Sequence, residues 1–313
     1  MQSEDRAFCD DLQADKPTGL KLWWVAARPK TLGLAVSPVI LATALALQNS
    51  GEIEHLEIPF IILLCAVAIQ VGTNLFNDEA DHANGTDNAK RLGPPRVTAS
   101  GWALPHQVRI AGFLAFFIAL CCGMYLAQTG GWPIAFGGLA ALFAGYFYSH
   151  GPAPIAHTPM GEVAVLLSFG FFAVGGTVFL LIGHVPTSTY LWGGVLGLPA
   201  AAVLMLNNIR DMESDRRAGR RTLAILIGDT AARRLYAVVM LAPFVLIVGG
   251  VAVEIIGPGA LFGFGAFFFT LKTIRAVRRL PSAPQLNPLL ARTVLGQILL
   301  ALSSALGVVL MPL

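Results

Sequence analysis

Nine runs of apolar residues, separated by polar connections, dominate this sequence. They cover residues 32–47, 58–76, 108–127, 132–148, 163–182, 190–206, 235–253, 260–274 and 289–311. A helix of about 20 apolar residues crosses the hydrocarbon core of a bilayer, and a chain in lipid must satisfy its backbone hydrogen bonds internally. With 55% of its 313 residues hydrophobic, the sequence predicts an all-α polytopic membrane protein with nine transmembrane helices.

The distribution of charge predicts the orientation of the chain. With the N-terminus inside and nine crossings, all 21 Lys and Arg residues fall on the cytoplasmic side or at its helix ends. The external connections carry acidic residues instead, namely Glu52, Glu54, Glu57 and Glu254. Lys and Arg in short loops stay on the cytoplasmic side and so set the orientation of the chain. We expect a protein of the inner membrane. Its N-terminus and the connections after the second, fourth, sixth and eighth helices should be cytoplasmic, and its C-terminus outside.

Composition also limits the domain organisation and the class of function. Residues 1–19 are rich in acidic side chains and are expected to form a disordered cytoplasmic tail, followed by one transmembrane domain over residues 20–313. The formal net charge of +3 is too small to suggest nucleic acid as a partner. The four cysteines lack the spacing of a zinc site and imply no disulfide. No obligate protein partner is evident.

Two polar blocks, residues 70–101 and 207–228, interrupt this apolar chain. In both, an Asn precedes an Asp by four residues and another Asp follows within four: Asn74, Asp78 and Asp81 in the first block, and Asn207, Asp211 and Asp215 in the second. Side chains three or four residues apart share one face of a helix. Several acids brought together near a bilayer repel one another, and divalent cations offset that cost. We therefore expect the blocks to face each other around divalent cations; helix capping with solvated charge is the alternative.

Basic residues are interleaved with these acids. Arg91 and Arg96 follow the acids of the first block, and Arg220 and Arg221 follow those of the second. Carboxylates with Mg²⁺ beside Arg donors form the grouping that holds a diphosphate. We count Asp87 among the substrate-binding residues of this grouping. Cytoplasmic placement of positive charge is the alternative explanation for the arginines.

Two tyrosines end the fourth apolar segment on the same side of the membrane. Tyr146 and Tyr148 could stabilise an allylic cation through their ring faces. An interfacial aromatic belt would explain the same pattern.

The residue sequences of the two blocks resemble those of one family of membrane enzymes. NDEADHANGTD and RLGPPRVTASG in the first block, and NNIRDMESDRRAGRRTLA in the second, are similar to the UbiA superfamily of intramembrane aromatic prenyltransferases. Within it, these motifs resemble the 1,4-dihydroxy-2-naphthoate polyprenyltransferases of menaquinone synthesis, as do the early RPKTL and the later GP and GE pairs.

The resemblance implies nine helices around a central cavity, capped by cytoplasmic loops at about residues 77–107 and 207–234. It implies two Mg²⁺ ions held by Asp78, Asp81, Asp211 and Asp215, with Asn74 and Asn207 as neutral ligands or diphosphate contacts. Arg28 and Lys30 become candidates for binding the acceptor carboxylate or the diphosphate. The expected reaction transfers a polyprenyl group from its diphosphate to an aromatic acid, with decarboxylation when the acceptor is 1,4-dihydroxy-2-naphthoate.

Two other functions compete with this one. The acceptor could be another aromatic acid, such as 4-hydroxybenzoate. Alternatively, the acids could form the cation site of a membrane transporter. Transporter sites favour the bilayer midplane, whereas these acids lie at helix ends on one side of the membrane.

Overall fold

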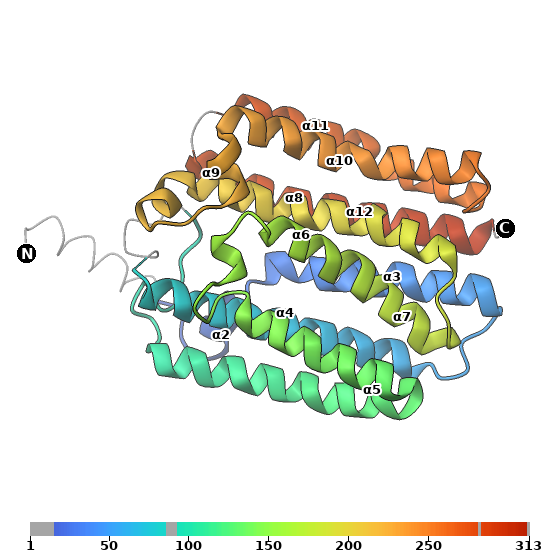
Figure 1. Cartoon of the computed structure of the whole chain (residues 1–313), viewed down its shortest axis with the longest axis horizontal. Coiled ribbons are helices and arrows are strands. Elements are labelled where there is room, and N and C mark those ends of the chain that lie inside the picture. The colour runs from blue at the N-terminus through green and yellow to red at the C-terminus, as the bar shows by residue number, and fades with distance from the viewer. Residues whose placement is uncertain (1–15, 86–92, 281–282, 312–313) are drawn as a thin grey trace, which may run out of the picture.

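The computed structural model describes residues 16–85, 93–280 and 283–311. Every regular element in this part of the chain is helical, which confirms the predicted all-α class (Figure 1). The long helices are α3 (Pro29–Ser50), α4 (Glu57–Ala83), α5 (Pro105–Phe147), α8 (Thr187–Arg217), α10 (Asp229–Ala252) and α12 (Asn287–Leu310). Shorter elements are α2 (Gly19–Ala27), η1 (Ile155–His157), α6 (Gly161–Val165), η2 (Leu166–Phe172), α7 (Ala173–Ile182), α9 (Leu223–Ile227), η3 (Pro258–Ala266), α11 (Phe267–Arg279) and η4 (Ala283–Leu286).

Eight stretches of the described chain are long and apolar enough to cross a membrane. They include three composite spans, Gly161–Ile182, Pro258–Arg279 and Pro284–Leu310. Large apolar side chains such as Phe117, Trp132 and Val245 are exposed on the outside of the bundle, as expected where the surrounding solvent is lipid. The chain is an integral membrane protein.

Helix α5 is one of the eight but contains two crossings. Its 43 residues are interrupted at Gly131, whose φ of 64° and ψ of −158° are not helical. Figure 1 shows the second arm of α5 turning back along the first. Counting the two arms separately gives nine crossings in the described chain, the number predicted from the apolar runs.

Gly131 is therefore expected to be intolerant of a side chain. Its backbone lies in a region that only glycine adopts readily, so Gly131→Ala should destabilise the protein by about 1–3 kcal/mol. Gly123→Ala is a matched control on the first arm of α5, where an added Cβ would meet no atom within 4 Å. Thermal unfolding in detergent should show a lower midpoint for Gly131→Ala alone; equal midpoints for the two variants would contradict this account of the turn.

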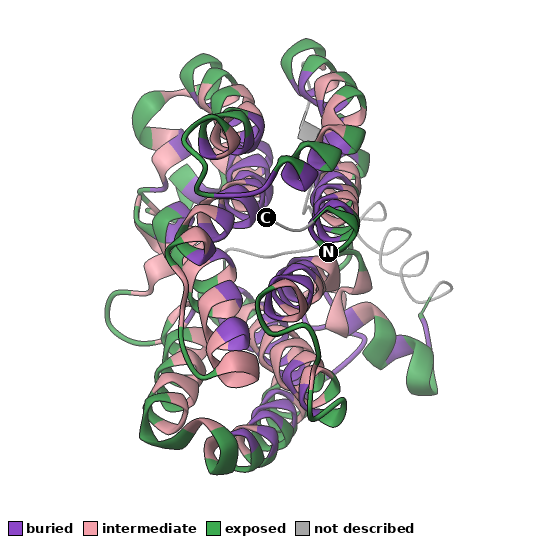
Figure 2. Cartoon of the chain, turned by 90° about the vertical axis from the view of Figure 1, so that its right-hand side faces the viewer, coloured by how far each residue is buried: buried purple, intermediate pink, exposed green. Residues whose placement is uncertain are grey.

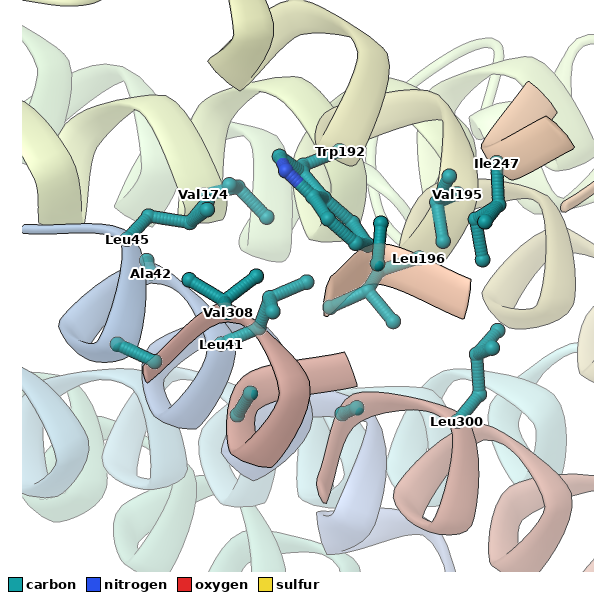
Figure 3. Close-up of a cluster of buried hydrophobic side chains, with 14 of the residues drawn as sticks. Leu41, Ala42, Leu45, Val174, Trp192, Val195, Leu196, Ile247, Leu300 and Val308 are labelled. Atoms are coloured by element: carbon teal, nitrogen blue, oxygen red, sulfur yellow. The ribbon is translucent and has the colours of Figure 1, made fainter. Parts of the chain in front are cut away.

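Buried side chains lie on the inner faces of the helices (Figure 2). The largest cluster joins α3, α7, α8, α10, η3 and α12, and its centre is Trp192 beside Leu196 and Val195 of α8 (Figure 3). A second cluster lies between α8, α10, α11 and α12 and includes the buried Tyr236. A third ties α2 and α4 to residues 97–108. Together these contacts place α8 in the middle of the bundle.

A π-helical segment, η2, interrupts the fourth span and was not predicted. It lies against α8, where a Cβ on Gly170 would overlap the Gly193 carbonyl oxygen and approach Gly197 Cα to 2.9 Å. Close backbone contact of this kind requires glycine. The segment directly follows α6, the element that carries Glu162.

Four acids of the two blocks, Asp78, Asp81, Asp211 and Asp215, lie near the ends of α4 and α8. The apolar runs predicted helix ends near residues 76 and 206, but α4 continues to Ala83 and α8 to Arg217. The sequences 77–83 and 207–217, expected in cap loops, are thus helical. Figure 1 shows both helix ends at the end of the bundle that also holds α2 and α9.

Candidate active site

Arg220 brings the two acidic blocks together. It follows α8, and its Nη2 donates to Asp81 Oδ1 on α4 while its Nη1 donates to Asp215 Oδ1 at 3.2 Å. The side chains of Arg220, Asp81 and Asp215 are only 9%, 5% and 4% exposed. An arginine between two carboxylates is a charge-assisted arrangement that is strong when desolvated. The structure therefore places acids from both blocks in one buried cluster.

Asn77 connects the remaining polar groups of this cluster. Its Oδ1 accepts hydrogen bonds from Arg96 Nη1 at 2.8 Å and Arg28 Nη1 at 3.0 Å. Its Nδ2 donates to Asp81 Oδ2 at 3.1 Å and to Ser149 Oγ at 3.3 Å. Asn77 was not among the predicted site residues, although it precedes Asp81 by the same four residues that separate Asn74 from Asp78.

Arg96 and Asp78 tie the segment after α4 to the helix. Arg96 Nη2 lies 3.4 Å from Asp81 Oδ2. The Asp78 carboxylate accepts backbone hydrogen bonds from Val97 at 3.1 Å and Thr98 at 3.3 Å. Asp78 is thus buried against the turn that covers the cluster. In the structure it holds this turn, and its proposed metal ligation stays a prediction.

Arg28 reaches the first block from the junction of α2 and α3. Its backbone is left-handed, with φ of 55°, and its Nη2 donates to the Asn74 carbonyl oxygen at 3.1 Å. The Asn74 side chain donates to the Ala27 carbonyl oxygen at 3.0 Å, so it holds the junction. Lys30, which was predicted together with Arg28 as a substrate-binding residue, is exposed.

The second block contains three further predicted residues. Asp211 is paired with its neighbour Arg210, whose Nε donates at 2.8 Å, and Arg210 also reaches Asn287 of η4–α12 at 3.2 Å. Asn207 is half-buried on α8, and Arg221 is exposed. The backbone N–H of Arg221 donates to the His157 carbonyl oxygen at 2.9 Å.

Positive charge from Arg220 also acts on His157. Burial, and then the Arg220 guanidinium, lower the pKa of His157 to about 4. His157 is therefore neutral at physiological pH.

The two predicted tyrosines occupy different environments. The Tyr146 ring stacks on His150, with ring centroids 4.6 Å apart, and meets Phe76 edge-on; it belongs to an aromatic cluster between α4 and α5. The Tyr148 hydroxyl lies 3.9 Å from the position that a Cβ on Gly161 would take. Burial raises the pKa of Tyr148, and the charges of Glu162 and Asp81 raise it further, against smaller opposing effects of Arg220 and Arg28. Tyr148 therefore lies close enough to be affected by the charges of the acidic cluster, whereas the Tyr146 ring packs on His150 and Phe76.

Two buried glutamates were not predicted as site residues. Glu79 binds Arg109 and lies 2.9 Å from His150 Nε2. These contacts connect α4 to the start of α5 and to the segment that follows α5. Glu162, on α6, accepts a hydrogen bond from Asn208 Nδ2 of α8 at 2.9 Å. Glu79 lies inside the first acidic block, next to Asp78, whereas Glu162 is the one charged residue of the span Gly161–Ile182. The isolation of Glu162 was the available signal.

The predicted residues Asp87 and Arg91 lie outside the described residues. Their roles stay predictions.

The residues present fit a hard divalent cation in their chemistry. Within the described ranges, no three His, Cys, Asp or Glu side chains are grouped closely enough to hold a metal ion by themselves. Nevertheless, Asp81 and Asp215 converge on one positive group, the Arg220 guanidinium. Carboxylate and amide oxygens are also the donors that Mg²⁺ takes in phosphate sites. The position between these carboxylates is one where positive charge is stabilised.

Curated relatives share most of the length of this chain. The 1,4-dihydroxy-2-naphthoate octaprenyltransferase of Bacillus subtilis is 31% identical over 258 residues, covering 82% of this chain and 81% of the relative. The enzyme of the same name from Mycobacterium tuberculosis is 32% identical over 288 residues, covering 90% and 95%.

Solved structures share the fold. A UbiA homolog from Aeropyrum pernix superposes with a TM-score of 0.66 at 15% identity, covering 87% of this chain and 96% of that one. A UbiA homolog from Archaeoglobus fulgidus, bound to GPP and Mg²⁺, gives 0.64 at 15% identity, covering 91% and 99%. The profile of the UbiA prenyltransferase family matches residues 35–286. With this match over most of its length, the chain belongs to the UbiA prenyltransferase family.

Proposed function

We propose that this enzyme transfers a polyprenyl group from polyprenyl diphosphate to 1,4-dihydroxy-2-naphthoate, with loss of carbon dioxide and release of diphosphate. The product is the prenylated naphthalenediol, which is the reduced form of demethylmenaquinone. Two buried aspartates, one from each acidic block, are joined by one arginine at one end of a membrane bundle, and this arrangement supports the function most directly. The names of the Bacillus and Mycobacterium relatives support the choice of acceptor. No observation favours 4-hydroxybenzoate or transport.

The cluster supplies charge where the leaving group forms. The allylic C–O bond breaks with its electron pair on the diphosphate, and Arg96 and Arg220 donate hydrogen bonds to the growing negative charge. The acceptor carbon that carries the carboxylate forms the new C–C bond, and carbon dioxide leaves as its bonding pair returns to the ring. Tyr148, rather than Tyr146, is assigned to the allylic cation because the Tyr146 ring is stacked on His150, whereas Tyr148 lies within range of the charges of the cluster. Burial of these groups excludes water that would convert the cation to an alcohol.

Magnesium is the proposed cofactor, and two ions are expected. Asp81 and Asp215 would hold it, with Asp78 and Asp211 as the further carboxylates and Asn74 and Asn207 as neutral ligands or diphosphate contacts. When bound, Mg²⁺ supplies positive charge that neutralises the diphosphate oxygens. The A. fulgidus homolog bound to GPP and Mg²⁺ supports this assignment.

The active-site end is proposed to face the cytoplasm of a cell with an inner membrane, and the C-terminus the outside. In a variant whose native cysteines are replaced by alanine, Glu54→Cys and Gln285→Cys place one exposed thiol at each end of the bundle. An impermeant maleimide added to intact cells should modify only Glu54→Cys. Modification of Gln285→Cys alone would reverse the orientation and move the site to the outside.

The acceptor is tested by competition. Purified enzyme with Mg²⁺ and one polyprenyl diphosphate is offered 1,4-dihydroxy-2-naphthoate and 4-hydroxybenzoate together, and products are identified by mass. We expect a decarboxylated prenyl naphthalenediol to be the main product. A prenylated hydroxybenzoate as the main product, or no diphosphate release with either acceptor, would contradict the proposal.

A further inference from the structure

Glu162 carries an unsatisfied oxygen in a buried position. The residue is 5% exposed. Its Oε1 accepts the hydrogen bond from Asn208 Nδ2 at 2.9 Å, whereas its Oε2 has no hydrogen-bond partner in the described part of the chain. A buried carboxyl oxygen without a partner is costly. It marks a place where another molecule can complete the hydrogen bonding.

This oxygen lies beside the proposed site, towards the interior of the membrane. Asn208, which holds the other oxygen, precedes Asp211 by three residues on α8, or about 4.5 Å along the helix axis. Gly161, the residue before Glu162, lies next to the Tyr148 hydroxyl. The charges of both Glu162 and Asp81 also raise the pKa of Tyr148. Glu162 therefore borders the acidic cluster without belonging to it.

The chemistry of the two substrates decides which of them Glu162 serves. A diphosphate is anionic and would be repelled by a carboxylate, and a polyprenyl chain has no donor to offer. An aromatic acceptor with ring hydroxyls brings O–H donors, and it must lie next to the allylic carbon at the edge of the diphosphate site.

We propose that Glu162 is an acceptor-binding residue whose Oε2 accepts a hydrogen bond from a ring hydroxyl of the aromatic substrate. This inference rests on the proposed function and adds to it the group that orients the acceptor. Asn208 is the positioning residue that holds the Glu162 carboxyl. The hydrogen bond also raises the electron density of the ring, which favours attack on the allylic carbon.

Two variants and a matched control test this role. Glu162→Ala removes both oxygens, and Glu162→Gln keeps the size of the side chain with a weaker acceptor. Thr177→Val is the control, because Thr177 is a buried polar residue of the same span that bonds only the Ala173 carbonyl oxygen of its own helix. We expect Glu162→Ala to lower kcat/KM for 1,4-dihydroxy-2-naphthoate by about ten- to a hundredfold, the value of a hydrogen bond to a charged group. Glu162→Gln should lower kcat/KM by less than Glu162→Ala, and Thr177→Val should leave kcat/KM almost unchanged.

The affinity for each substrate separates this role from general support of the fold. An unreactive polyprenyl thiodiphosphate should bind wild type and both Glu162 variants equally. 1-Hydroxy-2-naphthoate and 4-hydroxy-2-naphthoate, used as competitive inhibitors, each lack one hydroxyl. The inhibitor that lacks the bonded hydroxyl should bind wild type and Glu162→Ala with the same Ki, whereas the other should bind the variant more weakly.

Three results overturn the inference. Unchanged kcat/KM for the acceptor in Glu162→Ala would do so, as would an equal loss of thiodiphosphate affinity or an equal Ki penalty for both inhibitors. If wild type binds the thiodiphosphate but converts no naphthoate, the proposed function itself is wrong, and the assignment of Glu162 fails with it.

Discussion

Asp81→Asn and Asp215→Asn should each lower turnover at saturating Mg²⁺ by about 10²–10³-fold, the cost of removing one group that stabilises developing charge. Asn keeps the shape of the side chain and removes its charge. Each carboxylate is buried and faces the same guanidinium, so neither can be replaced by the other. Product formation per folded protein, with folding checked by size-exclusion chromatography, measures the effect.

Asp229→Asn is the matched control. Asp229 is also paired with an arginine, Arg233 at 2.8 Å, but its side chain is 52% exposed and lies at the start of α10. Exposed ion pairs contribute at most about 1 kcal/mol, so this variant should keep nearly full activity. Near wild-type turnover in Asp81→Asn or Asp215→Asn, or an equal loss in Asp229→Asn, would count against the shared cluster.

Arg220→Ala should produce the largest loss of stability. It leaves Asp81 and Asp215 buried without the cation between them, and breaking a buried pair by removing one partner costs about 3–5 kcal/mol. Because Mg²⁺ can supply the missing positive charge, the midpoint of thermal unfolding should rise more with added Mg²⁺ in Arg220→Ala than in wild type. Arg220→Lys should restore only part of the stability, since lysine lacks the fork that reaches two carboxylates.

Arg217→Ala provides the comparison for this variant. Arg217 lies at the end of α8, is 77% exposed and pairs only locally with Glu213. The free energy of unfolding of Arg217→Ala should lie within about 1 kcal/mol of the wild-type value. Added Mg²⁺ should raise its unfolding midpoint no more than it raises that of wild type. A similar midpoint for Arg217→Ala and Arg220→Ala would show that the bridge contributes little.

The number of crossings was predictable because lipid imposes a simple rule of length and hydrophobicity. Even the turn at Gly131 fell between two separate apolar runs. The ends of α4 and α8 were not predictable from hydropathy. Their last turns are charged, yet they stay helical because Asp81 and Asp215 find partners from distant parts of the chain.

The proximity of the two blocks was predictable from the sequence, whereas the neutral residue that connects the groups around them was not. The repeated spacing of Asn and Asp singled out both blocks, and the structure joins them through Arg220. Asn77 was missed because its role depends on Arg28 and Arg96 meeting one amide oxygen, a contact between segments far apart in sequence. Tyr146 and Tyr148 share a sequence pattern, and only the path of the chain after α5 separates their environments.

The most direct test of one shared diphosphate site is a double-mutant cycle on binding. The Kd of an unreactive polyprenyl thiodiphosphate, measured with Mg²⁺, is compared for wild type, Asp81→Asn, Asp215→Asn and the double variant. If both blocks hold the same diphosphate, the second substitution should cost little after the first, with a coupling free energy of about 0.5–3 kcal/mol. Free-energy losses that simply add, or single variants that bind as well as wild type, would contradict a site built from both blocks.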